Sequence, residues 1–419
     1  MALGATLAFV VGCDEPPPPL GAYDGGSLAT DGGADGSTAT DASTAIDASL
    51  PGCEVRVREI VDAATGDELE FDVTGGASAF EVVYTEHDPA HDPTRNAFFV
   101  RVPFGAAPSP AVPALAAGDE QRLGQPVVRA SGEGFVSVCS QTFDAAYDLS
   151  LVRLDASSSI AAGPTDLTST PTTADTHPAL LEVGASGFLL AYVVESLSMG
   201  SLVETPMLET LDALGASSGA PKAIVGMGDV RGALRLHALG GGAKLAWRDS
   251  GSIFRLATIA ADGTLGTVRA ISEPSEVAVD FDFAAGTTGG VAVYDVALTP
   301  SQSALRLRVL DSDGAPVGGE RDLLGGSRRG VAPALASGPG GYVVAYRGSD
   351  DGTHWSLRLA FVDASSYAVV RDEAVAALVT RAGRVRIGAE SGGRLLVVWD
   401  DARDGAPGVR LRAAELDCH

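Results

Sequence analysis

Short apolar runs recur along the chain, and Gly, Pro, Asp or Ser residues separate each run from the next. The clearest run is Gly341–Tyr346, in which a glycine turn leads into apolar residues that end on an aromatic side chain. Apolar runs of roughly four to eight residues bounded by turn residues predict β-strands joined by hairpins. Helical periodicity is weak, and a short helix or irregular insertion is expected only within Leu202–Leu214. The pattern therefore predicts an all-β fold.

One position in this pattern recurs at a nearly constant interval, and we call it the aromatic slot. Cysteine replaces the aromatic residue in one repeat, so that the slot holds Tyr84, Cys139, Tyr192, Trp247, Tyr294, Tyr346 and Trp399. Subtraction of successive numbers gives steps of 55, 53, 55, 47, 52 and 53 residues. A period near fifty is typical of repeat architectures, and four antiparallel strands per repeat are typical of a propeller blade. Seven slots predict a seven-bladed β-propeller of four-stranded antiparallel blades.

The two ends of the repeat region predict how the ring closes. The last repeat contains three predicted strands and ends at His419 before a fourth, whereas a spare strand, Glu54–Ile60, precedes the first repeat. We expect this N-terminal strand to complete the last blade as its outer strand, because closure removes two open sheet edges. Cys53 and Cys418 flank the two strands that would pair, so they are predicted to form a disulfide.

The segment before the repeats has a different composition. Residues 2–11 are apolar but too short to span a bilayer as a helix. The following Val10-Val11-Gly12-Cys13 resembles a bacterial lipobox, which implies a signal segment over residues 1–13 and a lipid on Cys13; an ordinary signal peptide is the alternative. Residues 14–52 are rich in Asp, Gly, Ala, Ser and Thr and predict a disordered acidic tether, which leaves residues 53–419 for the propeller.

Charge and cysteine content narrow the function classes. The chain has 29 basic and 54 acidic residues, a formal net charge of −25, so a nucleic-acid partner is not expected. Four cysteines fit an exported protein, and Cys139 is expected to be a buried small hydrophobe. Arginines recur on the predicted third strands and are expected to be paired or solvated there: Arg101, Arg153, Arg255, Arg306, Arg308, Arg358, Arg410 and Arg412.

One loop of the first repeat combines imidazoles and carboxylates. His87, Asp88, His91 and Asp92 are the candidate ligands of a divalent metal, because zinc accepts both His and Asp ligands. Pro89 favours turns over a helix that would place both imidazoles on one face, and an ordinary solvated loop is the alternative. No other cofactor is expected.

Acidic loops follow the second strands of several repeats. The run Trp399–Gly405 resembles the Trp-(Glu/Asp)-Asp-x-Arg signature of repeat propellers in secreted bacterial proteins, and Asp350–Trp355 partly resembles the Asp-box of sialidase propellers without its leading Ser or Thr. If these loops share one face of the ring, they predict a ligand rim; turn chemistry is the alternative. The rim residues are Asp350, Asp351, Trp355, Asp400, Asp401, Arg403 and Asp404.

The lipobox, spacer and repeats together resemble the uncharacterised repeat lipoproteins of myxobacteria and their relatives. The resemblance implies a monomer in the bacterial cell envelope, held by its lipid at the periplasmic face or the outer surface. Our first hypothesis is a non-catalytic binding or scaffold domain for an envelope protein or glycan, with no catalytic residue assigned. The alternative is a carbohydrate-active hydrolase or lyase with carboxylates in the propeller funnel, which requires two carboxylates in unequal environments within one pocket.

Overall fold

The computed structural model describes most of the predicted propeller. The signal segment and tether, residues 1–52, lie outside the described residues. The described ranges are 53–61, 70–87, 95–114, 122–132, 134–143, 146–170, 173–184, 187–198, 201–227, 230–286, 288–299, 302–325, 328–338, 340–390, 392–402 and 408–418. Within these ranges no helix has the length and apolar character needed to cross a bilayer.

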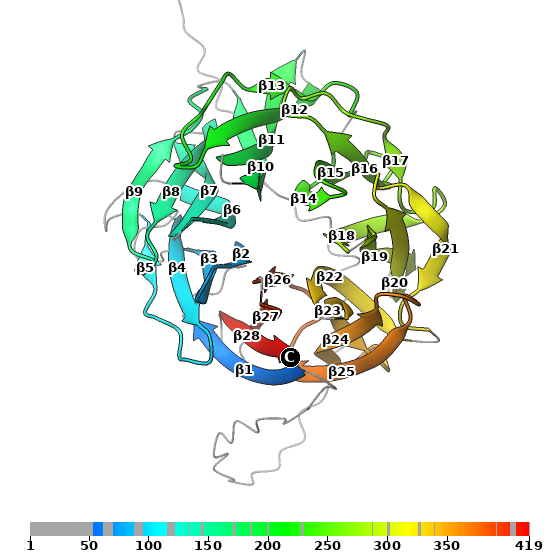
Figure 1. Ribbon diagram of the computed structural model, residues 1–419. Coiled ribbons are helices and arrows are strands. Elements are labelled where there is room, and N and C mark those ends of the chain that lie inside the picture. The colour runs from blue at the N-terminus through cyan, green and yellow to red at the C-terminus, as the bar shows by residue number, and fades with distance from the viewer. Residues whose placement is uncertain are drawn as a thin grey trace, which may run out of the picture.

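The described chain is a β-propeller, in which the sheets stand around one axis (Figure 1). Four of its sheets have four antiparallel strands each. One sheet joins the two ends of the chain and contains β1 (Cys53–Val61), β28 (Val409–Cys418), β27 (Arg394–Ala402) and β26 (Val385–Ala389). The other three follow chain order: β14 (Arg235–Leu239), β15 (Gly242–Arg248), β16 (Phe254–Ile259) and β17 (Arg269–Ala270); β18 (Val277–Ala285), β19 (Gly289–Thr299), β20 (Gln302–Asp311) and β21 (Pro316–Asp322); β22 (Arg329–Gly338), β23 (Gly341–Ser349), β24 (Trp355–Asp363) and β25 (Val369–Leu378).

The fifth sheet has twelve strands. They are β2 (Glu70–Gly75), β3 (Ala79–His87), β4 (Arg95–Pro103), β5 (Val112–Pro113), β6 (Arg122–Ser131), β7 (Gly134–Phe143), β8 (Ala146–Leu154), β9 (Ile160–Asp166), β10 (Ala174–Glu182), β11 (Gly187–Ser198), β12 (Ser201–Asp212) and β13 (Lys222–Ala223). Most neighbouring strands in this sheet are antiparallel, as in the four smaller sheets.

The predicted count of seven separate four-stranded blades is not confirmed, because the described strands form five sheets. The difference lies in two parallel contacts within the twelve-stranded sheet. Arg95 of β4 pairs with Arg122 of β6, and Ala174 of β10 pairs with Tyr147 of β8, each through a single residue pair. We call a strand that carries an aromatic slot, together with the strands that pair antiparallel in its group, a strand set. The two parallel contacts each link one strand set to the next, and they join three sets into one continuous sheet.

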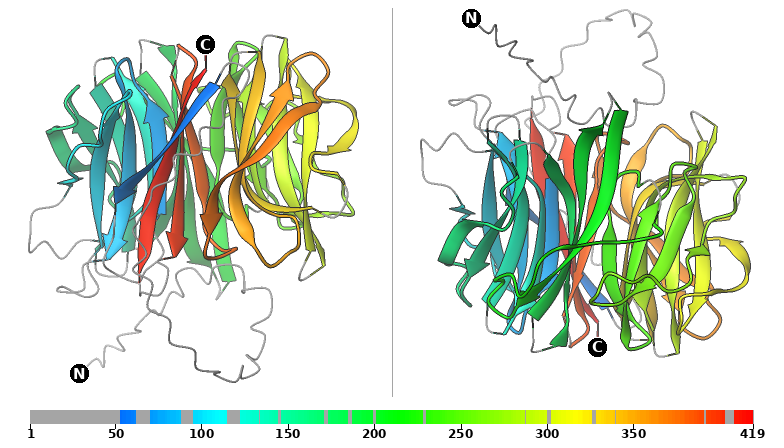
Figure 2. Two further views of the ribbon diagram at one scale, coloured as in Figure 1. Left: turned by 90° about the horizontal axis from the view of Figure 1, so that it is seen from below. Right: turned by 90° about the horizontal axis from the view of Figure 1, so that it is seen from above.

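Ring closure by the N-terminal strand is confirmed. Strand β1 pairs antiparallel with β28 from Cys53 opposite Cys418 to Val61 opposite Leu411. Cys53 and Cys418 form the predicted disulfide across 365 residues of sequence. Figure 2 shows the two strands side by side at the seam of the ring.

The expected irregularity at Leu202–Leu214 is wrong for most of its length. Strand β12 covers Ser201–Asp212 and pairs with β11 residue by residue, from Ser198 opposite Ser201 to Gly187 opposite Asp212. A full-length hairpin satisfies the backbone of both strands, and this tertiary pairing outweighs the weak local pattern.

The core is divided into apolar clusters, most of which lie between neighbouring sheets. One cluster joins Ala345 and Leu359 of one sheet to Val397 and Trp399 of the next. The aromatic-slot side chains Tyr192, Tyr294, Tyr346, Trp247 and Trp399 are among the largest fully buried ones. Cys139, which occupies another of the seven slots, is buried without a disulfide partner, and burial raises the pKa of its thiol to about 12. Its expected role as a buried small hydrophobe agrees with this position.

Several carboxyls are buried, and Glu81 is the least exposed of those in the described residues. Glu81 in β3 is fully buried and accepts a hydrogen bond from the hydroxyl of Ser158, which lies in the turn between β8 and β9. Burial raises the pKa of Glu81 to about 7, against smaller opposing effects of Ser158 and Arg101. Because this pKa exceeds the value of 4.5 for an ordinary glutamate, unfolding releases a proton between these two pH values.

We expect the disulfide to carry a large share of the stability. Closure of a loop of this length is worth at most about 5–6 kcal/mol in the chain-entropy model. Replacement of Cys53 and Cys418 by serine should therefore lower the free energy of unfolding in urea by several kcal/mol and abolish its sensitivity to reductant. A Cys139→Ala variant is the matched control and should keep that sensitivity; reductant-insensitive unfolding of the wild type would contradict the prediction.

The buried Glu81 predicts a pH dependence of stability. The contribution of its protonated form is complete below pH 4.5 and is lost as the pH rises to about 7, by at most about 3 kcal/mol. Glu81→Gln should flatten the decline of unfolding free energy over this interval, measured by urea titration at several pH values. The same substitution at the exposed Glu182 should leave the slope unchanged.

Candidate functional site

Charged side chains gather where the inner strands of the sheets surround the axis. Figure 1 shows β2, β6, β10, β14, β18, β22 and β26 nearest to that axis. We define the axial cluster as nine side chains on five of these strands: Glu70, Asp72, Arg129, Arg235, His237, Asp280, Asp282, Arg384 and Arg386. Arg384 lies immediately before β26 and the other eight lie within the strands.

Three arginine–carboxylate ion pairs and one histidine–carboxylate contact connect neighbouring inner strands within the axial cluster. Their nitrogen–oxygen distances lie between 2.8 and 3.8 Å: Arg384 with Glu70 at 3.3 Å, Arg129 with Asp72 at 2.8 Å, Arg235 with Asp280 at 3.8 Å, and His237 with Asp282 at 3.3 Å. Each pair joins two different strand sets of the ring. Side-chain exposure ranges from 9% for Glu70 to 40% for Arg384, so water reaches the cluster. These contacts connect the inner strands and leave their side chains partly exposed to water.

The inner strands are also irregular at matching places. Strands β6, β10, β18 and β22 each have a register shift against their neighbour. Gln125, His177 and Ala332 adopt φ values of 45°, 53° and 52° at three of these shifts. Such backbone persists only where its surroundings fix it, and a bulge leaves an N–H without a partner in the ladder.

Side-chain oxygens accept these unpaired N–H groups. Glu70 accepts the N–H of Gln125, and the amide oxygen of Gln125 in turn accepts the N–H of His177 at 2.6 Å. Asp295 accepts the N–H of Asp280 at 2.6 Å and that of Ala332 at 3.4 Å. Each oxygen satisfies a buried donor that would otherwise destabilise the fold. Most of these contacts cross from one strand set to the next, so the bulges act as joints between sets.

Two carboxylates beside the axis have different environments. Burial acts to raise the pKa of Asp282, but His237, Arg235 and the N–H of Leu335 outweigh it and lower the pKa. Burial raises the pKa of Asp295 to about 7, the charge of Asp280 adds to the rise, and the two accepted N–H groups oppose it. Asp295 is only 3% exposed, so its carboxyl serves the backbone and is withdrawn from solvent.

Arg386 differs from the rest of the axial cluster. Burial lowers its pKa to about 10, and the positive charges of Arg235 and Arg384 lower it further, against the carboxylates of Asp280 and Asp72. These neighbours come from strands on different sides of the ring in Figure 1. Within the described residues, its one hydrogen bond goes to the carbonyl oxygen of Val385 at 2.8 Å.

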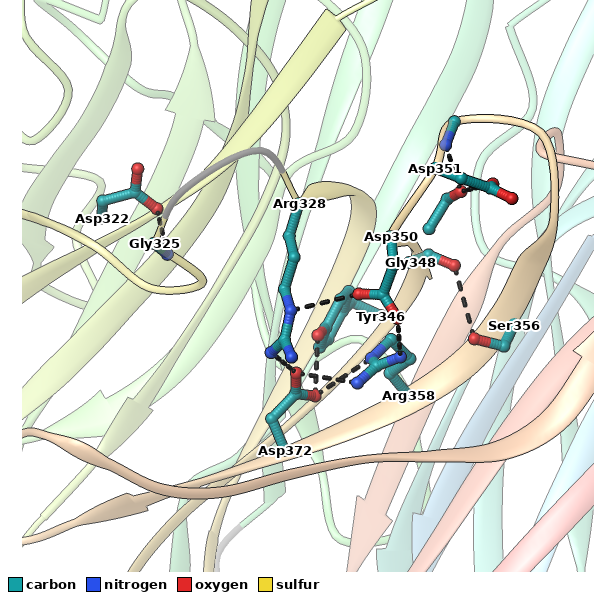
Figure 3. A network of polar contacts seen from close by, with 12 residues as sticks. Asp322, Gly325, Arg328, Tyr346, Gly348, Asp350, Asp351, Ser356, Arg358 and Asp372 are labelled. Atoms are coloured by element: carbon teal, nitrogen blue, oxygen red, sulfur yellow. Dashed lines mark hydrogen bonds and ion pairs between the residues drawn. The ribbon is translucent and has the colours of Figure 1, made fainter.

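The structure places the predicted rim residue Asp350 in a network outside the axis. Figure 3 shows Asp350 between the guanidiniums of Arg328 and Arg358, at 3.1 and 3.3 Å. Asp372 of β25 accepts both guanidiniums and the hydroxyl of Tyr346. Tyr346 therefore combines its position in the aromatic slot with a hydrogen bond to this ion-pair network.

The same arrangement recurs one sheet earlier, where Tyr294 donates to Glu320, and Arg306 pairs with Glu276, Glu320 and Asp322. Several third-strand arginines are paired as expected, including Arg255 with Asp249 and Arg410 with Asp401. Arg412 instead lies over the ring of Trp399 at 5.4 Å. These contacts stabilise the outer parts of the sheets.

The other predicted rim residues serve different tasks. Asp351 accepts the N–H groups of Thr353 and His354 and contacts the His354 imidazole, which lowers the pKa of Asp351 and raises that of His354. Trp355 lies at 5.4 Å from the guanidinium of Arg381. Arg403 and Asp404 lie outside the described residues.

Asp400 and Asp401 are buried side chains that connect segments of backbone. Asp400 pairs at 2.7 Å with Arg347, which is itself fully buried, and accepts the N–H of Arg384 at 2.6 Å. Asp401 accepts the N–H of Val379 at 3.0 Å. Asp400 and Asp401 of the Trp-Asp-Asp motif thus connect the sheet of β22–β25 to the sheet of β26–β28. Their use as a ligand rim stays a prediction.

The predicted metal loop is described only at its start. His87 ends β3, whereas Asp88, His91 and Asp92 lie outside the described residues. Across the ranges that are described, no group of three or more His, Cys, Asp or Glu side chains is arranged to hold a metal ion. The metal site stays a prediction.

Sequence reasoning missed the axial cluster, although a signal was present. Charged residues stand two apart in the first strand of several repeats, as in Arg235 and His237, or Asp280 and Asp282. Subtraction from the aromatic slot gives 247 − 235 = 12 and 294 − 282 = 12. Charges at a fixed offset before the slot predict one shared location in the folded repeat.

A separate hollow lies between two sheets away from the charged axis. It has a volume of about 320 Å³ and is lined mainly by apolar residues, among them Phe188, Leu189, Leu211 and Ile259. It contains none of the charged residues of the axial cluster, so the cluster is the better candidate for recognition of a polar ligand.

The fold has known relatives in structure. No protein-family model matches the chain, and no curated protein matches it. A protein of unknown function from Dyadobacter fermentans is 13% identical, with a TM-score of 0.52, over 88% of this chain and 100% of the other. That likeness shows a shared fold.

Two glycoside-acting proteins are more distant. A Penicillium chrysogenum α-L-arabinanase, solved with arabinobiose, is 12% identical over 57% of this chain and 92% of its own, with a TM-score of 0.40. A GH43_1 enzyme from Xanthomonas citri, solved with xylose, is 15% identical over 86% of this chain and 89% of its own, with a TM-score of 0.36.

We expect the buried pair of Arg347 and Asp400 to be required for stability. Asp400→Asn leaves the guanidinium of Arg347 buried without its counter-charge, which should cost about 3–5 kcal/mol of unfolding free energy. The double variant Arg347→Met with Asp400→Asn should cost clearly less than the sum of the single variants in chemical denaturation. Additive losses would contradict direct coupling of the two side chains.

Proposed function

We propose that the chain is an exported, non-catalytic binding module whose ligand, an envelope protein or glycan, contacts the axial cluster of the propeller. The observation that carries the proposal is the engagement of the axial carboxylates. Glu70, Asp72 and Asp280 each pair with an arginine, Asp282 contacts the imidazole of His237, and Asp72 and Asp282 also accept a backbone N–H. Carboxylate oxygens that already accept hydrogen bonds from such donors are poorly placed to take a proton from a substrate.

Partial exposure of the same side chains supports ligand access. The Arg, His and Asp side chains of the cluster offer both donors and acceptors around one axis. A polar ligand could replace water there without disturbing the apolar clusters between sheets. Recognition of this kind suits a rigid scaffold in which convergent polar groups come from several strands.

The seven-bladed ring belongs to the same proposal. The seven aromatic-slot residues occupy β3, β7, β11, β15, β19, β23 and β27, each the second strand of a four-strand set. We infer that the twelve-stranded sheet comprises three blades joined at the Arg95–Arg122 and Ala174–Tyr147 contacts. This count agrees with the repeat period of the sequence.

We further propose that a lipid on Cys13 anchors the protein in a bacterial envelope, with residues 14–52 as the tether and the propeller as a monomer. The acidic balance of the chain supports an envelope setting without nucleic acid, since phosphate would be repelled.

One observation favours the alternative of a carbohydrate-active hydrolase. Asp295, with a pKa raised to about 7, lies next to the ion-paired Asp280. Two neighbouring carboxyls in unequal environments resemble an acid and base pair. The burial of Asp295 and its two accepted N–H groups weigh against this alternative, because a catalytic acid must reach its substrate.

A glycan and envelope-protein array tests the proposal. We expect the full chain with Cys13→Ser, which prevents lipid attachment, to bind array components saturably and to release no reducing sugar from bound glycans. Asp295→Asn should leave this binding within about twofold of the starting protein. Sugar release that disappears in Asp280→Asn or Asp295→Asn would instead establish the hydrolase.

A further inference from the structure

We propose that Arg386 is the anchor of a binding site for a singly charged carboxylate group at the axis of the ring. This inference rests on the proposed binding function and names the chemistry of its ligand. It arises from the side-chain pairing within the axial cluster, from the position of Arg386 among strands on different sides of the ring, and from its unused hydrogen-bond donors.

The side-chain pairing within the axial cluster leaves one guanidinium over. Four carboxylates of the axial cluster pair with Arg384, Arg129, Arg235 and His237. Among the described residues, Arg386 belongs to none of these pairs, and its guanidinium makes one hydrogen bond, to the carbonyl of Val385. A guanidinium has five N–H donors, so four remain for water or a ligand. The cluster is complete as a structural network without Arg386.

The surroundings make an unpaired guanidinium unfavourable. Arg386 is partly buried, and its nearest charged neighbours include the guanidiniums of Arg235 and Arg384. The lowering of its pKa to about 10 has burial as its first cause and these like charges next. Removal of a charge from water is costly unless a counter-charge is supplied, and an anion bound at Arg386 would supply it.

The geometry of the donors selects a carboxylate. Guanidinium presents a planar fork that matches two oxygens of one carboxylate, and such paired hydrogen bonds are among the strongest in proteins. Asp72 and Asp280 also act on Arg386, and their negative charge disfavours anions of higher charge such as phosphate. The one unpaired guanidinium therefore fits one carboxylate, as carried by an acidic sugar or by an acidic peptide side chain.

Isothermal titration of the full chain with Cys13→Ser tests this site. D-glucuronate represents an acidic sugar and N-acetylaspartate amide represents an acidic peptide side chain. At least one should bind, whereas D-glucose should not, and inorganic phosphate should bind more weakly. We expect Arg386→Met, which keeps an apolar side chain of similar length, to lower the affinity for the carboxylate ligand at least tenfold.

A matched variant controls for total charge. Arg321→Gln removes one positive charge from the exposed outer strand β21, where its guanidinium contacts the carbonyl of Ser366, and should leave the affinity within about twofold. Thermal unfolding checks the fold: Arg386→Met should melt no lower than the wild type without carboxylate, because it removes an unpaired charge, and should lack the rise that carboxylate gives the wild type.

The outcomes separate this inference from the proposed function. Equal carboxylate affinity in the wild type and Arg386→Met, or no carboxylate binding by the wild type, would overturn the inference. Saturable binding of neutral glycans or envelope proteins in the same preparation would then leave the binding function in place. Sugar release with no binding component would overturn the proposed function itself.

Discussion

The antiparallel pairing of β1 with β28 closes the ring and brings its first and last sheets together. It joins the two ends of the repeat region, and the Cys53–Cys418 disulfide holds the joint covalently. Without it, the first and last strand sets would have exposed sheet edges, and Arg384 and Glu70, 314 residues apart in sequence, would not meet. The contact between Arg384 and Glu70 near the axis therefore depends on the pairing of β1 with β28 at the outside of the ring.

Closure also explains why the inner strands tolerate irregular backbone. A bulge in an isolated hairpin leaves an N–H exposed to water, whereas a bulge at the axis lies within reach of the neighbouring strand set. Glu70 and Asp295 accept such groups across this boundary. The irregular backbone and the charged side chains are thus parts of one arrangement, in which side-chain oxygens of one strand set accept the unpaired N–H groups of the next.

Polar interactions in this protein divide by radius. In the outer parts, arginines of the third strands form networks with acidic side chains, as Arg306 and Arg358 do, and those networks close within or between adjacent strands. At the axis, pairs cross between strand sets and remain open to water. The networks of the third-strand arginines lie in the outer parts of the sheets, while Arg386 near the axis keeps donors available. This division places the capacity for recognition where a ligand would meet several strand sets at once.

Most of the strands, the repeat and the ring closure could be predicted from the amino-acid sequence. Turn residues and apolar runs act locally, and Cys53 and Cys418 flank strands whose pairing follows from an incomplete last repeat. Sequence did not determine how the strands divide into sheets, because the joining of the twelve-stranded sheet depends on single contacts such as Arg95 with Arg122. The roles of Asp400 and Arg386 could not be predicted either. Asp400 lies in a recognisable motif and Arg386 in a predicted strand, and both positions are compatible with a structural or a binding role. These roles follow from the folded ring, because the partner of a charged side chain there comes from a strand set far away in sequence.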